Sequence, residues 1–276
     1  MAITAKQVNE LRKATGAGMM DCKKALVEAE GDFDKAVEIL RKKGQKVSSK
    51  RSDREANEGS VFAYSEGGKA ALIELNCETD FVARNEDFVA MGEQLVKTAF
   101  DASPADLTAF LALEVDGRPV SDHLTDAMGK IGEKISVSKY ETLEADGVVT
   151  YIHPGGRVGV GVAFTGIDGV DIDTVGKDVA MQIAAMKPVA LDKDDVPQAI
   201  VDQELKIGRE QALAAGKPEA ILDKIAQGKL NKFFKENTLL NQEFVKDTSK
   251  TIAQYLKEAN PDLKVKAFSR LQLGAS

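Results

Sequence analysis

Residues 67–73 read GGKAALI and residues 155–160 read GGRVGV, two similar stretches at an offset of 88 residues (155 − 67). The same offset relates two further pairs, Gly59 with Gly147 and Gln94 with Gln182. Each copy has the pattern of a strand, a glycine hairpin turn, a second strand and a helix, because paired glycines between alternating apolar segments are typical of tight hairpins. We therefore predict an α+β fold with two repeated subdomains built on antiparallel sheets.

The repeat divides most of the chain into an expected N-terminal core subdomain, residues 59–143, and a C-terminal core subdomain, residues 144–276. Inside the second, residues 196–215 and 219–237 have helical patterns, and Gly216-Lys217-Pro218 stops one helix and starts the next. Thin apolar seams on otherwise polar helices predict a projecting coiled-coil hairpin at about 196–237. The expected seam residues are Ile200, Leu205, Ile207, Ile221, Ile225 and Leu230.

Residues 1–44 have the pattern of a small three-helix unit. Thr4 and Gln7 have the spacing of a capping box, and Asp32 precedes the third helix as its expected N-cap. We expect that helix to end at Gly44. Residues 45–58 are polar and charged without apolar periodicity, so they indicate a linker, or a charged helix with little to bury.

Composition excludes several classes of protein. The 276 residues are 43% hydrophobic and carry a net charge of −7, which gives no overall attraction to nucleic acid. Two cysteines without a CxxC spacing argue against a disulfide framework or a zinc site. The N-terminus has no apolar signal segment, and no apolar run is long enough to cross a bilayer. We expect a cytoplasmic protein that does not bind membranes.

Motifs for catalysis are also missing from the sequence. It has no GxSxG nucleophile elbow and no phosphate-binding loop of the GxxxxGK[ST] type. Its two histidines, His123 and His153, have no convincing partner motif. Asp171 and Asp173 hint at a calcium loop, but Val175 stands where a third ligand is needed. We expect no catalytic residue, no bound metal, no cofactor and no enzymatic activity.

Two stretches remain to be explained. Residues 11–26 read LRKATGAGMMDCKKAL, and the adjacent methionines Met19 and Met20 cannot both point inward on one helix face. At least one exposed methionine is therefore expected, which suits protein binding. Residues 74–84 read ELNCETDFVAR. Residues 79–82 are expected to form a loop between a strand and a helix that begins near Asn85, a position where functional groups are often displayed.

Together these stretches closely resemble the two signatures of the elongation factor Ts family. The resemblance extends to HPGGRVGV at 153–160, AAMKP at 184–188 and the GKP at 216–218, and so covers nearly the whole chain. It implies a guanine-nucleotide exchange factor that binds elongation factor Tu in its GDP-bound and nucleotide-free states. It implies no direct binding of nucleotide by this chain.

The resemblance also implies roles for particular residues. A ubiquitin-associated-like N-terminal unit would dock on the G domain of elongation factor Tu through Arg12, Met19 and Met20. A second set would enter near the magnesium and phosphate site and dislodge the magnesium ion: Thr79, Asp80, Phe81 and Val82. His153 would contact another domain of the partner, and the coiled-coil hairpin would reach away from the body.

A different class of function remains open at this stage, a peptide- or RNA-binding scaffold. The basic residues 41–43 and 46–54 give it some support. This alternative predicts that Phe81 is buried and that its loss destabilises the fold, whereas the exchange hypothesis predicts an exposed Phe81.

Overall fold

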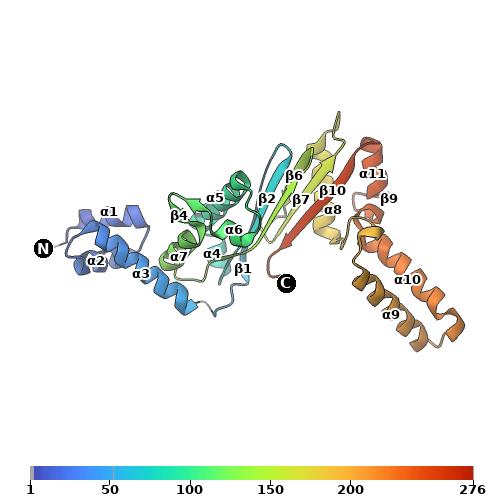
Figure 1. The fold of residues 1–276 in the computed structure, drawn as a ribbon, viewed down its shortest axis with the longest axis horizontal. Coiled ribbons are helices and arrows are strands. Elements are labelled where there is room, and N and C mark those ends of the chain that lie inside the picture. Colours follow the sequence, from blue (N-terminus) through green and yellow to red (C-terminus); the bar gives the residue numbers. More distant parts are fainter. Residues whose placement is uncertain (1–2, 52, 276) are drawn as a thin grey trace.

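The computed structural model describes residues 3–51 and 53–275. It shows an N-terminal helical unit, a central body built on two three-stranded sheets, and a helical arm at the far end (Figure 1). The N-terminal unit contains α1 (Ala5–Thr15), α2 (Met19–Glu28) and α3 (Phe33–Arg51). The predicted capping box is confirmed: Thr4 Oγ1 accepts from the Gln7 amide, and Gln7 Oε1 accepts from the Thr4 amide. Asp32 Oδ1 likewise accepts from the Lys35 amide at 3.0 Å. The core of this unit consists of Val8, Leu11, Cys22, Ala25, Leu26, Ala29 and Ala36.

The expected end of the third helix at Gly44 is wrong, because α3 continues to Arg51. Gly44 is buried where α3 crosses α7 (Val120–Ile131), and a Cβ at position 44 would lie 3.3 Å from the Thr125 carbonyl oxygen. A Cβ on the facing Gly129 would lie only 2.8 Å from Gly44 Cα. The glycine therefore permits close helix packing instead of ending a helix. Of the two interpretations of residues 45–58, the charged helix holds for residues 45–51.

The two halves of the sequence repeat form sheets with the same strand arrangement. In the first, β2 (Lys69–Cys77) lies between β1 (Glu58–Glu66) and β5 (Ser136–Glu144); in the second, β7 (Val158–Thr165) lies between β6 (Gly147–Ile152) and β10 (Lys264–Gln272). All four pairings are antiparallel. Each hairpin is followed by a long helix, α5 (Glu86–Ala102) or α8 (Ile172–Met186). The mixed helical and antiparallel composition agrees with the predicted α+β class.

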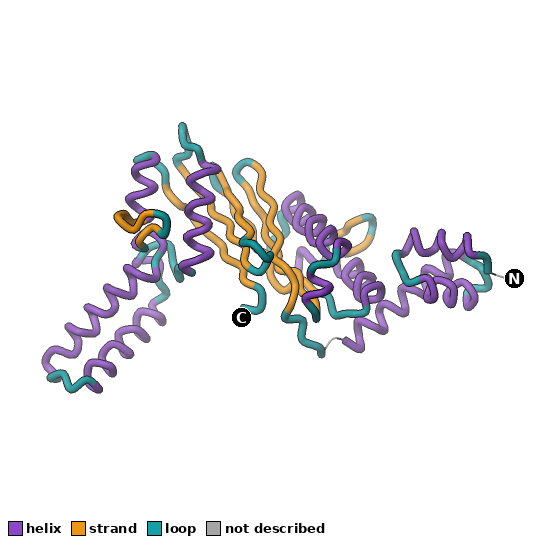
Figure 2. Tube along the Cα trace, turned by 180° about the vertical axis from the view of Figure 1, so that it is seen from behind, coloured by secondary structure: helices purple, strands orange, loops and turns teal. Residues whose placement is uncertain are grey.

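These elements stack in four layers, with α5 and α8 outside and the two sheets inside (Figures 1 and 2). Alternate residues of β2 face α5, whereas those of β7 face α8, because side chains alternate across a strand. The opposite faces meet each other: Val61 and Leu72 of the first sheet pack on Leu271 of the second. Both sheets are therefore covered on both faces over this region.

Small residues of β7 allow the two sheets to approach closely. A Cβ at Gly159 would lie 2.4 Å from Val61 Cγ1, and a Cβ at Gly161 would lie 2.7 Å from Leu143 Cδ1. The sequence correctly predicts a hairpin and strand here. The inter-sheet contact is what requires the glycines within the strand, since glycine otherwise weakens a strand interior.

Shorter elements complete the body. The first half also contains α4 (Asp80–Ala83), α6 (Leu107–Leu111), β3 (Glu114–Val115) and β4 (Arg118–Pro119). The second half also contains η1 (Lys193–Asp195), η3 (Leu239–Asn241), β8 (Glu243–Phe244), β9 (Asp247–Thr251) and α11 (Ile252–Ala259).

The arm consists of α9 (Gln198–Ala214), the short η2 (Glu219–Ile221) and α10 (Leu222–Asn237). It projects away from the body in both views (Figures 1 and 2). Of the predicted seam residues, Leu230 is buried, Ile221 is exposed, and the other four are partly buried. The remaining buried residues of the two helices are Gly208, Ala212, Leu222 and Ala226. A Cβ at Gly208 would lie 3.1 Å from Ala226 Cα, so α9 and α10 approach each other through small residues.

Gly228 offers a test of this arrangement, because it lies on the exposed face of α10 with no atom within 4 Å of an added Cβ. We expect Gly228→Ala to raise the free energy of unfolding by about 0.5–1 kcal/mol, since alanine loses less backbone entropy in a helix. The matched Gly208→Ala should raise the free energy of unfolding less, or lower it, because its Cβ would lie 3.1 Å from Ala226 Cα. Urea unfolding followed by circular dichroism measures both, and a destabilised Gly228→Ala would contradict the expectation.

Candidate partner-binding site

The segment predicted as a loop, residues 79–82, is instead a short capped helix. Thr79 is the N-cap of α4, and its hydroxyl accepts from the Val82 amide at 3.4 Å. Phe81 points outward with 83% of its surface exposed, although phenylalanine is usually buried. The scaffold hypothesis, which requires a buried Phe81, is therefore wrong on this point.

The α4 turn is held from outside by Glu133, which follows α7. Glu133 Oε2 accepts from the Glu78 and Thr79 amides at 3.2 and 3.0 Å, and Glu133 Oε1 accepts from the Thr79 hydroxyl at 2.7 Å. Three hydrogen bonds to a carboxylate are among the stronger polar contacts in proteins. They fix the backbone immediately before Phe81.

The Glu78 side chain also supports the start of the α4 turn, through contacts with Lys134 and with two arginines. Its Oε1 accepts from the Lys134 amide and from Arg51 Nη1, both at 2.6 Å, and its Oε2 accepts from Arg54 Nη1 at 2.9 Å. Burial opposes ionisation of this carboxyl, but the Lys134 amide and the two guanidinium groups outweigh it and lower its pKa to about 2. The residues around Glu78 thus join the end of α3 to the start of the α4 turn.

These contacts make the stability of the fold depend on pH. The pKa of Glu78 falls from 4.5 to about 2 in the folded state, so its stabilising effect is complete above about pH 5 and is lost as the pH falls towards 2. We expect Glu78→Gln to lower the free energy of unfolding by about 2–3 kcal/mol at pH 7. The difference from wild type should shrink between pH 4.5 and pH 2. Urea unfolding across this range measures it, with the exposed Glu114→Gln as control; a pH-independent difference would contradict the linkage.

Asp80 and Val82 flank the exposed ring. The Asp80 carboxylate forms an ion pair with Arg84 at 3.0 Å; the Arg84 side chain is 80% exposed and that of Asp80 49%. An exposed pair of this kind contributes little stability, so Asp80 can change partners readily. Within residues 3–51 and 53–275, no group of three or more His, Cys, Asp or Glu side chains is arranged to hold a metal ion.

The N-terminal unit displays a second apolar surface. Met19 and Met20 begin α2 and have 54% and 62% of their surface exposed. Arg12 is exposed on α1. The sequence predicted at least one exposed methionine, and the structure shows two.

His153 lies in the turn between β6 and β7 and is exposed; its Nδ1 is 3.0 Å from the Tyr151 hydroxyl. This turn and α4 meet at the start of β1. Glu58 pairs with Cys77 at the end of β2, just before α4, and its carboxylate binds Arg157 of the turn at 2.5 Å. The structure therefore brings His153 and Phe81 to one end of the sheet body, whereas Met19 and Met20 lie on α2 of the N-terminal helical unit.

Glu78 and Glu133 are the residues that sequence reasoning missed. Glu78 stands inside the quoted stretch 74–84, but Glu133 lies 54 residues beyond Thr79. No local pattern links such distant residues, so only the fold reveals the contact.

The site is thus a set of exposed apolar side chains on rigid supports, the kind of surface with which one protein binds another. Comparison with known proteins makes this specific. The sequence profile of the family described as "Elongation factor TS" matches residues 78–275. Proteins named "Elongation factor Ts" from Amoebophilus asiaticus and Porphyromonas gingivalis are 53% and 50% identical, each over 100% of both chains. That of Cytophaga hutchinsonii is 52% identical over 98% of this chain and 99% of its own.

The chain belongs to the elongation factor Ts family, the guanine-nucleotide exchange factors of elongation factor Tu in translation elongation. In the part of the chain that the structure describes, no helix has the length and apolar character needed to cross a membrane.

Proposed function

We propose that this chain releases GDP from elongation factor Tu by inserting the α4 turn, residues 79–82, beside the partner's magnesium and phosphate site. The observation that carries the proposal is Phe81, an aromatic ring 83% exposed on a turn whose backbone is fixed. Large exposed aromatic groups are typical anchors of protein interfaces.

Rigid support matters because few additional groups lose conformational freedom on binding. Less of the binding free energy is therefore lost to ordering the turn. Phe81 acts as an apolar wedge against side chains that support the magnesium site. Asp80 leaves Arg84 and competes for local donors, and Thr79 and Val82 fix the position of the turn. Once the magnesium ion is displaced, the charge of the diphosphate is poorly compensated and GDP departs faster.

Other surfaces hold the partner in place. Arg12, Met19 and Met20 would bind the G domain, and His153 would contact a second domain. The arm at 196–237, which we interpret as a coiled-coil hairpin, reaches away from the body. The subdomain boundaries at residues 44, 58 and 143 remain our proposal, with α3 extending across the first.

The partner is elongation factor Tu in its GDP-bound and nucleotide-free states, and this chain makes or breaks no bond itself. Since binding free energies are linked, GDP must weaken binding of this chain to the partner by the same factor as the chain weakens binding of GDP. GTP binding then lets the chain leave. Translation elongation places this activity in the cytoplasm.

The test is release of a fluorescent GDP analogue from elongation factor Tu, with excess unlabelled GDP and catalytic amounts of this chain. We expect release to accelerate with chain concentration and each molecule to act many times. Equal rates with and without the folded chain would overturn the proposal.

A further inference from the structure

A groove of about 750 Å³ runs along β1, between α5 and the β6–β7 turn. Its lining is mostly apolar and includes Phe62, Tyr64, Val89, Val96 and Ile152. An open apolar surface of this kind is uncommon on a protein without a binding role. The groove is open to solvent.

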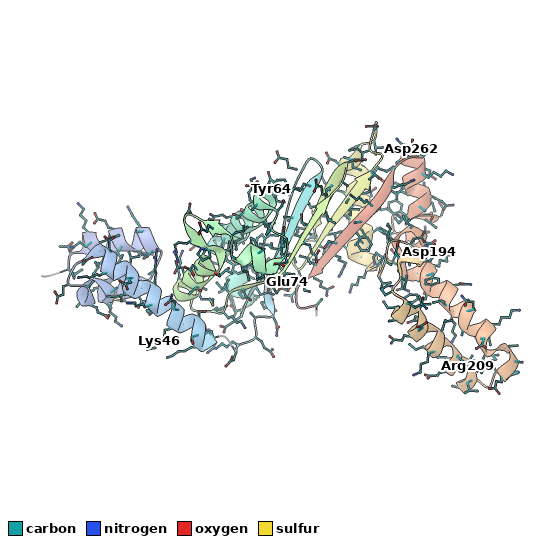
Figure 3. All side chains as sticks on the ribbon, in the orientation of Figure 1. Lys46, Tyr64, Glu74, Asp194, Arg209 and Asp262 are labelled. Carbon is teal, nitrogen blue, oxygen red and sulfur yellow. The ribbon has the colours of Figure 1, made fainter. Side chains whose placement is uncertain are left out.

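The two ends of the groove are fixed by well-defined contacts. At one end, the Val61 amide donates to the Gly156 carbonyl at 2.7 Å, which ties β1 to the β6–β7 turn. The other end lies at Tyr64, which is labelled in Figure 3. Its ring centroid is 4.8 Å from that of Phe100 on α5, and Lys97 Nζ is 4.7 Å from the centroid of the Tyr64 ring. The groove is therefore part of the folded structure and does not need to form on binding.

Its position connects two elements of the proposed partner-binding site. Ala83 and Arg84, at the end of the turn that carries Phe81, line one wall. Ile152 and Gly155, which flank His153 in the other turn, line the opposite wall. A partner that contacts both Phe81 and His153 must pass over the groove between them.

We propose that the groove is a third contact for elongation factor Tu and receives an apolar segment of that partner, so that Phe81, the groove and His153 form one continuous surface. This inference rests on the proposed function. The rim carries Arg84, Glu93 and Lys97, which have mixed charge, so charge does not select the occupant. The apolar floor selects the occupant instead, because it favours branched aliphatic or aromatic side chains.

Val89→Glu tests the contact, because Val89 is only partly buried and glutamate is well tolerated in helices. The matched control is Val245→Glu, a valine 43% exposed in the hairpin that joins β8 and β9. We expect Val89→Glu to require at least about tenfold more chain for half-maximal GDP release, with an unchanged melting temperature. Val245→Glu should behave as wild type. Wild-type behaviour of a folded Val89→Glu would overturn the groove contact alone.

A second readout reports directly whether the groove is covered. Both native cysteines, Cys22 and Cys77, are buried, so Glu93→Cys places one accessible thiol on the rim. Nucleotide-free elongation factor Tu should slow its reaction with a maleimide at least tenfold and leave Val245→Cys unaffected. An equally reactive thiol in a complex that still exchanges GDP would overturn the inference, whereas a wild-type chain that neither binds nor exchanges would overturn the proposed function as well.

Discussion

Phe81→Ala is expected to slow catalysed GDP release by about 10- to 100-fold while leaving the free energy of unfolding within about 0.5 kcal/mol of wild type. The two effects separate because the ring is 83% exposed. Its removal takes little apolar surface out of the core, but it removes the side chain that would enter the partner. The measurement combines fluorescent GDP release with urea unfolding of each variant.

Phe88→Ala is a suitable control, because Phe88 lies on the next helix and is fully buried. It should show the opposite pattern, with stability reduced by about 3–5 kcal/mol. Phe81→Leu should retain part of the exchange activity, since it keeps an apolar side chain on the same turn. A destabilised Phe81→Ala, or one with full exchange activity, would contradict the role of Phe81 as a wedge.

Much of the fold could be predicted from the sequence because its signals are local. The capping box at Thr4, the N-cap at Asp32 and the glycine hairpin turns depend on residues a few positions apart. The repeat at an offset of 88 residues also predicts two copies of a strand, a hairpin turn, a second strand and a helix. These features agree with the structure.

Features that depend on distant residues could not be predicted in this way. Gly44 was predicted to end a helix, because no local sequence pattern shows that it packs against α7. Ile221 looked like a seam residue, because helical spacing alone does not show that α9 and α10 approach through Gly208 and Ala226. At the site, Phe81 stood within a recognisable stretch, whereas its support by Glu133 depends on a contact across 54 residues.

The inter-sheet glycines give the second large effect. Gly159→Val is expected to lower the free energy of unfolding by about 3 kcal/mol, because the new side chain must occupy space now filled by Val61 and Ile152. Valine favours strands more than glycine does, so any loss must come from crowding of the new side chain, against Val61 of the other sheet and against Ile152 on the neighbouring strand β6. Ser138→Val, at an exposed position of β5, is the control and should change stability by less than about 0.5 kcal/mol.

A double variant identifies the cause of that loss. Val61→Ala removes both methyl groups of the side chain that a Cβ at position 159 would meet at 2.4 Å, and on its own should cost about 1–2 kcal/mol through the cavity it creates. Combined with Gly159→Val, it should restore stability relative to the sum of the single changes by about 1–3 kcal/mol, since the two side chains compete for one space. Urea unfolding of all four proteins gives this interaction energy. Strict additivity would mean that Gly159 does not set the spacing of the sheets.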